Sequence, residues 1–248
     1  MFALLVVALL AVGVIDARAA AGDDAICRPV SHRGAPYVVC EVDPSRHAVK
    51  LFLNDENGSP LGHFSALDDR VRTGGDRLVM AMNGGMYHRD RSPVGHYVED
   101  GETRLGVNLR EGPGNFHMLP NGVFFVTERG AGVLESAAYD AAELDVLYAT
   151  QSGPMLVIDG ALHPRFLPDS DSLKRRNGVG AREDGALVFA VSDAPVRFHD
   201  FATLFRDRLN APNALYLDGT ISRLHAPGLG RSDPGVAMGP IIGVVAAE

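Results

Sequence analysis

Short apolar runs separated by turn-forming residues dominate the chain. They are rich in Val, Leu, Ile and Phe, and they span residues 37–42, 49–53, 78–82, 123–127, 155–158, 186–192, 215–217 and 241–245. Runs of this length, bounded by Gly, Pro, Asn or Asp, are typical of β-strands. The pair Asp159-Gly160 follows one of them and accepts the positive φ angles of a two-residue hairpin turn. The pattern therefore predicts a strand-rich fold.

Helical periodicity is strongest in residues 199–209, where charged residues lie opposite an apolar stripe. The stripe comprises Phe201, Leu204, Phe205 and Leu209. A second, weaker helix is predicted over residues 136–144. Because strands outnumber helices and do not alternate regularly with them, the pattern predicts the α+β class, with mixed, strand-rich sheets and a few helices. We expect residues 22–248 to form one domain.

Residues 1–21 have the layout of an export signal. The apolar run 2–15 is shorter than the roughly 20 residues that a transmembrane helix needs. The small-x-small triplet Ala17-Arg18-Ala19 that follows is typical of a signal-peptidase site. We expect a periplasmic or secreted protein with no integral membrane span after cleavage. An uncleaved anchor is the alternative, because no Lys or Arg precedes the apolar run.

Charge and cysteine content narrow the partners. The 248 residues carry a formal net charge of −8. An acidic chain is a poor ligand for nucleic acid, since phosphate binding relies on clustered Lys and Arg. The one basic cluster, residues 174–176, suffices for a single anionic group. In an oxidising compartment Cys27 and Cys40 are expected to form a disulfide that staples the N-terminal strand; two free thiols are the alternative.

Three apolar runs end in the same way, with a hydrogen-bonding side chain close to a glycine. These ends are Asn83-Gly84-Gly85, Gln151-Ser152-Gly153 and Asp218-Gly219-Thr220. Glycine lets backbone N–H groups approach a ligand that a Cβ would obstruct. We therefore predict an active cleft at strand ends, where the segments near positions 83, 151, 176 and 218 converge.

Seven motifs follow one another along the chain. They are NGGMY (83–87), PVGHYVEDGE (93–102), NGVFFV (121–126), ATQSGPMLVIDGALHP (149–164), RRNGVG (175–180), VSDAPVRFHDFATLFRD (191–207) and LYLDGTIS (215–222). In this order they resemble the phosphodiester glycosidase family, in its compact bacterial branch, from about residue 45 to the C-terminus. The animal member of that family, the lysosomal uncovering enzyme, removes N-acetylglucosamine from a phosphodiester on mannose.

The resemblance implies an exported hydrolase that removes a sugar, with an N-acetylhexosamine as the first candidate, from a phosphodiester-linked glycan or envelope polymer. The chain departs from the family at two places. Many members carry Asp-Gly-Gly-Gly-Ser where this chain has residues 218–222, Asp-Gly-Thr-Ile-Ser. Many also carry Arg-Thr-Ala-x-Gly where it has residues 176–180, Arg-Asn-Gly-Val-Gly.

Cleavage of a glycosidic bond requires a carboxylate that stabilises an oxocarbenium-like centre or activates water. A departing phosphate diester needs a cation more than it needs a strong acid. Asp218 is the first catalytic candidate, followed by Glu99 and Asp193. Each has a structural alternative: Asp218 and Asp193 as turn residues, and Glu99 as a solvated strand end.

Arg176 is the expected phosphate ligand, because the planar guanidinium matches phosphate oxygens. Lys174 and Arg175 are expected in a solvated loop. The remaining candidates for substrate binding flank these residues: Asn83, Gly84, Gly85, Tyr87, Gln151, Ser152, Gly153, Asn177, Gly219 and Thr220. For Asn83 a structural role at the strand end is an equal alternative.

No His, Asp or Cys cluster has the spacing of a metal site, so no metal or other cofactor is expected. A Ca²⁺ ion in the loops 54–57 or 169–171 is the alternative left open. Two rival functions stand beside the hydrolase. One is a catalytically silent, glycan-binding envelope protein, which the altered loop after Asp218 favours. The other is an envelope assembly protein, which predicts a large apolar surface patch. A serine hydrolase is excluded, because Ser152 lacks the G-x-S-x-G elbow.

Overall fold

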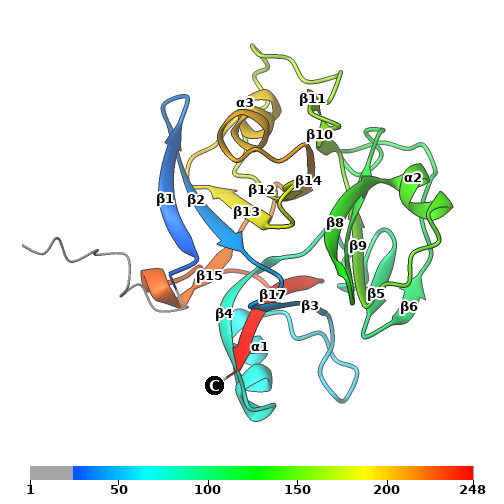
Figure 1. Ribbon diagram of the computed structural model, residues 1–248, viewed down its shortest axis with the longest axis vertical. Coiled ribbons are helices and arrows are strands. Elements are labelled where there is room, and N and C mark those ends of the chain that lie inside the picture. Colours follow the sequence, from blue (N-terminus) through cyan, green and yellow to red (C-terminus); the bar gives the residue numbers. More distant parts are fainter. Residues whose placement is uncertain (1–24, 248) are drawn as a thin grey trace, which may run out of the picture.

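Three antiparallel β-sheets surround one hydrophobic core in the computed structural model, which describes residues 25–247 (Figure 1). The predicted export signal, residues 1–21, lies outside the described residues. Within the described part, no helix is long and apolar enough to cross a membrane.

The first sheet has seven strands and carries the longest helical segment of the C-terminal half on its outer face. In spatial order the strands are β1 (Cys27–His32), β2 (Ala35–Val42), β13 (Leu187–Ser192), β12 (Asn177–Ala181), β14 (Asn213–Asp218), β10 (Met155–Ile158) and β11 (Ala161–Leu162). Helix α3 (Phe198–Thr203) continues into the π-helical turn η1 (Leu204–Arg208), and together they bury Phe201, Leu204 and Phe205. This confirms the helix predicted over residues 199–209 and shows that its second half is wound more loosely.

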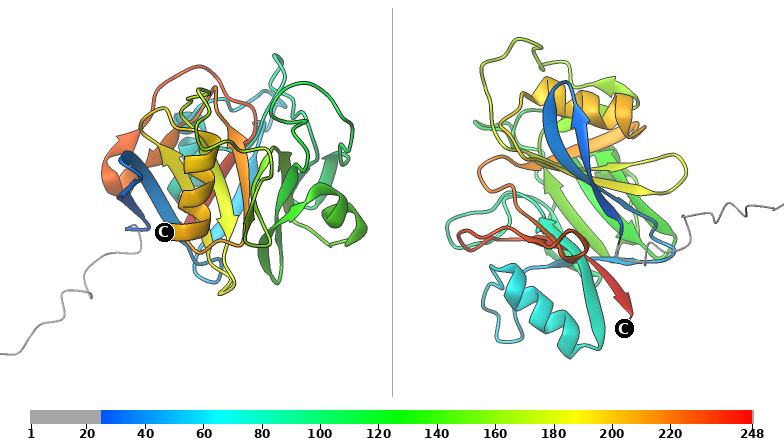
Figure 2. Two further views of the ribbon diagram at one scale, coloured as in Figure 1. Left: turned by 90° about the horizontal axis from the view of Figure 1, so that it is seen from above. Right: turned by 90° about the vertical axis from the view of Figure 1, so that its left-hand side faces the viewer.

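The second sheet contains the C-terminal strand and is covered by α1 (Phe64–Thr73). Its spatial order is β16 (Arg231–Ser232), β15 (Leu224–Ala226), β4 (Asp76–Asn83), β17 (Ile241–Ala247) and β3 (Ala48–Phe52). Helix α1 buries Phe64, Leu67 and Val71, which lie on one helical face. Figure 2 shows α1 and α3 on opposite outer sides of the molecule, with the strands between them.

The third sheet is built around β9 and is flanked by α2 (Ser136–Ala141). Its spatial order is β6 (Glu102–Leu105), β5 (Tyr97–Glu99), β9 (Tyr148–Ser152), β7 (Gly122–Thr127) and β8 (Gly130–Glu135). Helix α2 occupies the first part of the helix predicted over residues 136–144. Its Tyr139 packs with the sheet residues Val98, Val123 and Ala149.

The three sheets share a single apolar cluster. Met80 from the second sheet, Tyr97 from the third and Leu215 from the first all belong to it. Across the same core, the rings of Phe124 and Phe189 meet edge to face with their centroids 6.0 Å apart. Because each sheet buries its inner face against the other two, the sheets are fixed relative to one another, and so are their strand ends.

The strand pattern of the sequence is confirmed in the fold. All eight predicted strands are present, as β2, β3, β4, β7, β10, β13, β14 and β17. The Asp159-Gly160 turn joins β10 to β11 with φ angles of 47° and 80°. The α+β class is confirmed as well. The sheets differ from the prediction in one respect. They are antiparallel and not mixed, because every strand pair within residues 25–247 is antiparallel.

The predicted disulfide is present. Cys27 on β1 lies directly opposite Cys40 on β2, and their sulfur atoms are bonded. Both side chains belong to the common core. The bond therefore fastens the edge strand β1 to the sheet at the point where the described chain begins.

Replacement of both Cys27 and Cys40 by Ser is expected to lower the free energy of unfolding by about 2–3 kcal/mol, the entropy that a short cross-linked loop removes from the unfolded chain. Urea unfolding followed by circular dichroism measures this change. Dithiothreitol should destabilise the wild-type chain by a similar amount and leave the double variant unaffected. Identical unfolding curves for the oxidised and reduced wild-type chain would contradict the expectation.

Candidate active site

Two buried asparagines join the ends of strands from two sheets. Asn83 ends β4, and Asn177 begins β12. The Asn83 Nδ2 group donates to Asn177 Oδ1 (3.1 Å), and Asn177 Nδ2 donates to the Asn83 carbonyl (2.9 Å). Asn177 Oδ1 also accepts from the backbone N–H of Asp218 (3.1 Å), and Asn83 Oδ1 accepts from that of Arg223 (3.0 Å). We call these four residues the amide junction.

The third sheet joins the same place through two hydroxyl groups of β9. Thr150 Oγ1 donates to the Gly84 carbonyl, and Ser152 Oγ donates to the Leu217 carbonyl, both at 2.8 Å. The segments near positions 83, 151, 176 and 218 therefore converge as predicted, but of these four residues only Asp218 lines a cavity. Their amide and hydroxyl side chains are buried, so they connect the sheets.

Asp218 stands at the end of β14 with its two carboxylate oxygens in different roles. Oδ1 accepts from the backbone N–H groups of Gly219 (2.6 Å), Thr220 (2.8 Å) and Ile221 (3.5 Å). Oδ2 has no hydrogen-bond partner within residues 25–247, and the side chain lines a cavity. Burial raises the pKa of the carboxyl group, and the backbone N–H groups of Thr220, Gly219 and Ile221 lower it in part. One oxygen thus holds the turn, and the other is free for a ligand.

Gly219 is required by its neighbour Tyr216. A Cβ at position 219 would lie 1.8 Å from the Tyr216 hydroxyl oxygen, so no larger residue fits without displacing that ring. Thr220 and Ile221, which replace glycines common in the family, do not adopt positive φ angles. The loop therefore keeps its hydrogen bonds to Asp218 with side chains at both positions.

The cavity beside Asp218 has a volume of about 500 Å³ and mixed chemistry. It is lined by Met86, Tyr87, Arg91, Val94, Asn115, Lys174, Tyr216, Asp218, Gly219, Thr220, Ile221 and Val236. Its charged side chains are one carboxylate, Asp218, and two cations, Arg91 and Lys174. Such a wall suits a ligand that carries one negative charge next to uncharged hydroxyl or amide groups.

The predicted substrate-binding residues divide into a wall and a scaffold. Tyr87, Gly219 and Thr220 line the cavity together with Asp218. Asn83, Gly84, Gly85, Gln151, Ser152, Gly153, Arg176 and Asn177 are buried and do not line it. The structure thus brings both groups to one place but gives only the first group access to a ligand.

Gln151 shows why such a residue belongs to the scaffold. Its Oε1 accepts from the backbone N–H groups of His96 (3.0 Å) and Asn108 (2.9 Å). Its Nε2 donates to the Asn108 carbonyl and to Ser136 Oγ, both at 2.8 Å. All hydrogen-bonding positions of the amide are therefore occupied by the protein itself.

Arg176 is fully buried beside the cavity wall. Its guanidinium lies 3.5 Å from the ring centroid of Phe198 and 5.5 Å from that of Tyr216. Nε and Nη2 donate to the carbonyls of Val196 (2.9 Å) and Ser172 (3.0 Å). Nη1 has no hydrogen-bond partner within residues 25–247, and no carboxylate there forms an ion pair with this guanidinium. Arg176 does not reach the cavity itself, because the ring of Tyr216 lines the cavity and the guanidinium lies beside that ring.

Glu99 lies apart from Asp218. Its buried carboxylate is surrounded by the Tyr97 hydroxyl (3.2 Å), Arg104 Nε (3.7 Å) and Arg70 Nη1 (3.9 Å). Strand β5 pairs with β9 so that Val98 faces Ala149, three residues from Ser152, the residue that contacts β14. At a rise of about 3.3 Å per residue, Glu99 is at least about 10 Å along the sheet from that contact. The two carboxylates do not form a pair.

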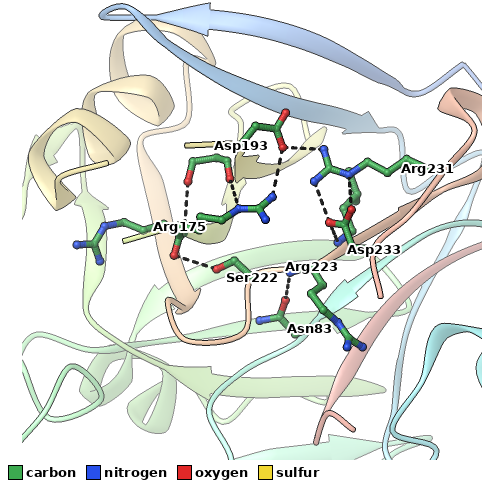
Figure 3. Close-up of polar contacts among 10 residues, drawn as sticks. Asn83, Arg175, Asp193, Ser222, Arg223, Arg231 and Asp233 are labelled. Atoms are coloured by element: carbon green, nitrogen blue, oxygen red, sulfur yellow. Dashed lines mark hydrogen bonds and ion pairs between the residues drawn. The ribbon is translucent and has the colours of Figure 1, made fainter. Parts of the chain in front are cut away.

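Asp193 belongs to an ion-pair network outside the cavity wall, which Figure 3 shows. Its Oδ1 accepts from Arg231 Nη1 (2.8 Å) and lies 3.6 Å from Arg175 Nη2. Arg231 also forms a two-pronged contact with Asp233, at 2.9 and 2.8 Å. Asp233 in turn accepts from the backbone N–H of Leu224 (3.0 Å). The network thus holds the segment that follows Asp218 against the β13 end.

Eight wall residues were not among the sequence candidates, and four of these are polar: Arg91, Asn115, Lys174 and Tyr216. Lys174 lies in an exposed loop, as predicted, and from there it also lines the cavity. Tyr216 shares a strand face with Asp218, two residues away, so alternation along the strand could have identified it. Arg91 lies in a turn with a φ of 76°. The sequence around it is that of an ordinary surface turn, so no sequence signal identifies it as a cavity residue. Within residues 25–247, no group of three or more His, Cys, Asp or Glu could hold a metal ion.

Comparison with known proteins identifies relatives over most of the chain. A family model described as phosphodiester glycosidase matches residues 76–226. The uncharacterized protein YigE of Escherichia coli K12 is 38% identical over 187 residues, which cover 75% of this chain and 73% of that protein.

Two solved structures share the fold. One is the catalytic domain of zebrafish N-acetylglucosamine-1-phosphodiester α-N-acetylglucosaminidase, auto-inhibited by pro-peptide, with a TM-score of 0.63 and 16% identity over 88% of this chain and 81% of that one. The other is a hypothetical protein from Synechocystis, with a TM-score of 0.59 and 14% identity over 89% of this chain and 61% of that one.

Replacement of Asn83 by Ala is expected to lower the free energy of unfolding by about 1–3 kcal/mol, because the buried N–H of Arg223 loses its partner and Asn177 Oδ1 loses one of its two donors. Thermal or urea unfolding measures the change. The matched control is Asn57→Ala on an exposed loop, which should stay within about 0.5 kcal/mol of the wild type. Equal effects of the two substitutions would rule out a stabilising role for the amide junction.

Gly219→Ala is expected to destabilise the chain by about 1–3 kcal/mol through the clash with Tyr216. In the double variant Tyr216→Phe/Gly219→Ala the hydroxyl is gone, and the nearest ring atom, Cζ, lies 3.1 Å from the added Cβ. Part of the lost stability should therefore return. The melting temperatures of the two single variants and the double variant test this coupling. Strictly additive effects would show that the hydroxyl is not the obstacle.

Proposed function

The chain belongs to the phosphodiester glycosidase family, and from this premise we propose that it hydrolyses the bond between the sugar and the phosphate of a sugar-1-phosphodiester, which releases the free sugar and a phosphate monoester. The observation that carries the proposal is the cavity wall, where one free carboxylate oxygen of Asp218 shares the space with the cations of Arg91 and Lys174. A sugar-1-phosphodiester has the matching chemistry, since its reacting carbon develops positive charge and its phosphate is an anion.

In this mechanism Asp218 acts at the sugar. Its Oδ2 stabilises the oxocarbenium-like centre or activates the attacking water, while the backbone N–H groups of residues 219–221 hold Oδ1 in place. Tyr87 and Tyr216 lie near enough for the Asp218 charge to raise the pKa of both hydroxyls, after the larger effect of burial. Both phenols therefore stay protonated.

Lys174 and Arg91 act at the leaving group. An ammonium and a guanidinium stabilise the phosphate oxygens as the glycosidic bond breaks. The buried charge of Arg176 beside Tyr216 adds positive potential to the same side. Because the phosphate monoester that departs is a weaker base than an alkoxide, the reaction needs little protonation by a second carboxyl group. A site whose wall carries a single carboxylate fits this leaving group.

Two further observations support a choice of substrate and of location. The zebrafish enzyme of the same fold is named for N-acetylglucosamine, which makes an N-acetylhexosamine the first sugar to test. The signal-like sequence of residues 1–21 and the Cys27–Cys40 disulfide favour export to the periplasm or the medium. We therefore place the target bond in a phosphodiester-linked glycan or envelope polymer.

Release of free sugar from a panel of sugar-1-phosphodiesters tests the proposal. Asp218→Asn should abolish turnover and keep the fold, since the Asn oxygen still accepts from the turn. Lys174→Ala should lower kcat/KM by about 10- to 100-fold, the value of one charge-assisted hydrogen bond. Arg129→Ala, an exposed arginine on the β7–β8 turn, is the control and should match the wild type. Binding of the sugar without turnover by the wild type would instead support a silent glycan-binding protein.

The pH dependence gives a second readout of Asp218. Its pKa is raised by burial, so kcat/KM should begin to fall at a pH above the ordinary range of an aspartate as the solution is acidified. A raised pKa in the folded chain also means that the ionised form is destabilising at neutral pH. Asp218→Asn should therefore unfold no more easily than the wild type at pH 7. Clear destabilisation of this variant at pH 7 would assign Asp218 a structural role.

A further inference from the structure

We propose that residues 233–238 form a substrate-binding strap, in which Val236 contacts the apolar C–H face of the sugar ring and Arg223 positions Val236. The strap forms neither helix nor strand, and it lies outside residues 76–226, the part of the chain that the family model matches. The inference rests on the proposed function, because it assigns a contact to the sugar of the same substrate.

Val236 brings an apolar side chain to the wall of the active-site cavity. It lines the cavity together with Asp218 and is 59% exposed. A single exposed valine is ordinary on a protein surface. This one differs in two respects: it stands on the wall of a cavity that contains a free carboxylate oxygen, and hydrogen bonds fasten the strap on both sides of it.

The two ends of the strap are tied to the second sheet and to the loop before α1. At the first end, Asp233 accepts from the Leu224 N–H (3.0 Å) and from Arg231 (2.8 Å), and its own N–H donates to the Leu224 carbonyl (3.0 Å). At the other end, the Met238 N–H donates to the Gly62 carbonyl (2.8 Å). The strap therefore has a fixed course without regular secondary structure, which lowers the entropic cost of binding a ligand.

Arg223 fixes the middle of the strap. Its guanidinium lies 5.3 Å from the ring centroid of Phe64, and Nη1 donates to the Val236 carbonyl (2.9 Å). A Cβ at Gly235 would collide with Nη1, so the backbone of the strap runs directly against the guanidinium. The backbone N–H of Arg223 donates to Asn83 in the amide junction (Figure 3). One residue thus connects the buried scaffold to the strap.

The cavity wall next to the strap is apolar as well. Tyr87 and Ile221 line the cavity, and both pack against the apolar cluster that contains Met238, the last residue of the strap. The charge on this side is Arg91, whose guanidinium lies 5.3 Å from the ring centroid of Tyr87. Val236 therefore extends an apolar surface that Tyr87 and Ile221 begin.

The polar groups of the wall come from other segments. Asn115 lies on the β6–β7 connection, Lys174 precedes β12, and Tyr216 and Asp218 belong to β14. A pyranose ring has both kinds of surface, since its C–H groups form an apolar face and its polar substituents lie at the ring edge. Contact between that face and an aliphatic side chain removes apolar area from water. The sugar half of the substrate therefore fits a wall with one apolar side.

Turnover of the methyl diester of N-acetylglucosamine-1-phosphate, or of the sugar that the diester panel identifies, tests the contact. Val236→Ser should raise KM by about 3- to 10-fold and leave kcat within about 2-fold, because it removes binding that does not depend on the transition state. Val236→Ile should keep the wild-type KM. The matched control is Leu229→Ser, which replaces a 40% exposed leucine that does not line the cavity and should match the wild type.

Binding of the two products locates the contact on the substrate. Val236→Ser should weaken binding of the free sugar by about 3- to 10-fold and leave binding of methyl phosphate unchanged. Lys174→Ala should show the reverse pattern, because we assign Lys174 to the phosphate. Calorimetry or ligand-observed NMR measures both dissociation constants. Weaker binding of methyl phosphate to Val236→Ser, with unchanged binding of the sugar, would overturn the assignment.

Arg223→Gln tests the positioning role, since the backbone bond to Asn83 does not depend on the side chain. This variant should raise KM by about 2- to 5-fold, and the effect should vanish in the Val236→Ser background, because Arg223 acts through Val236. Arg223→Lys, which keeps a charged donor, should recover part of the wild-type KM. A lower melting temperature with unchanged KM, or fully additive effects in the double variant, would overturn the positioning role.

The outcomes separate this inference from the proposed function. An unchanged KM in Val236→Ser, or equal effects of Val236→Ser and Leu229→Ser, overturns the strap and leaves the proposed function intact. Absence of turnover on every sugar-1-phosphodiester overturns the proposed function. Sugar binding that Val236→Ser weakens would then still support the strap, as part of a glycan-binding site. Absence of both turnover and sugar binding overturns the two together.

Discussion

The buried hydrogen bonds between Asn83 and Asn177 are the constraint on which the site depends. An amide in an apolar environment is costly unless it is fully hydrogen-bonded, and the partners of each of these amides lie outside its own strand. Only one arrangement of β4 against β12 satisfies both. That arrangement also fixes the backbone N–H of Asp218, which donates to Asn177 Oδ1, and so sets where β14 ends. The position of the carboxylate is therefore a consequence of how two sheets meet.

The ion pairs around Arg231 form a second layer of contacts outside this junction. They contribute less to the free energy of folding than the buried hydrogen bonds of the junction do. The side chains of Arg175, Asp193, Arg231 and Asp233 are 18–46% exposed, so each pair is worth at most about 1 kcal/mol. Loss of a partner from a buried amide costs about 1–3 kcal/mol for every group left unpaired. The junction therefore determines where the strand ends, and the network adjusts the loop that follows, through Asp233 and Leu224.

The sequence predicts the framework better than it predicts the wall. Alternation and turn residues identify eight strands because burial acts on each strand locally. Helix α1 was not predicted from the sequence. Its buried stripe has only Phe64, Leu67 and Val71, and its N-cap His63 makes no side-chain hydrogen bond. Strand β12 was not predicted either, because Asn177, Gly178 and Gly180 are poor strand formers. The two glycines let Leu156 and Phe205 pack closely against the strand. The wall residues Arg91 and Lys174 come from loops whose course depends on the whole fold, and no local pattern specifies them.

The motifs that carry the family resemblance supply both the buried scaffold and much of the cavity wall, including Tyr87, Tyr216 and Asp218, whereas the two cations of the wall lie outside them. Asn83, Gln151, Ser152 and Asn177 stand in motifs and are buried, while Lys174, Asn115 and Arg91 stand between or beside the motifs and line the cavity. The scaffold fixes Asp218 and the chemistry that it supports, and the loops decide which substrate reaches it. The loop after Asp218 illustrates the division. Its backbone needs no positive φ angle at Thr220 or Ile221, so side chains there leave the carboxylate in place while they occupy space on the cavity wall. A change of substrate in this fold can therefore occur without any change at the amide junction.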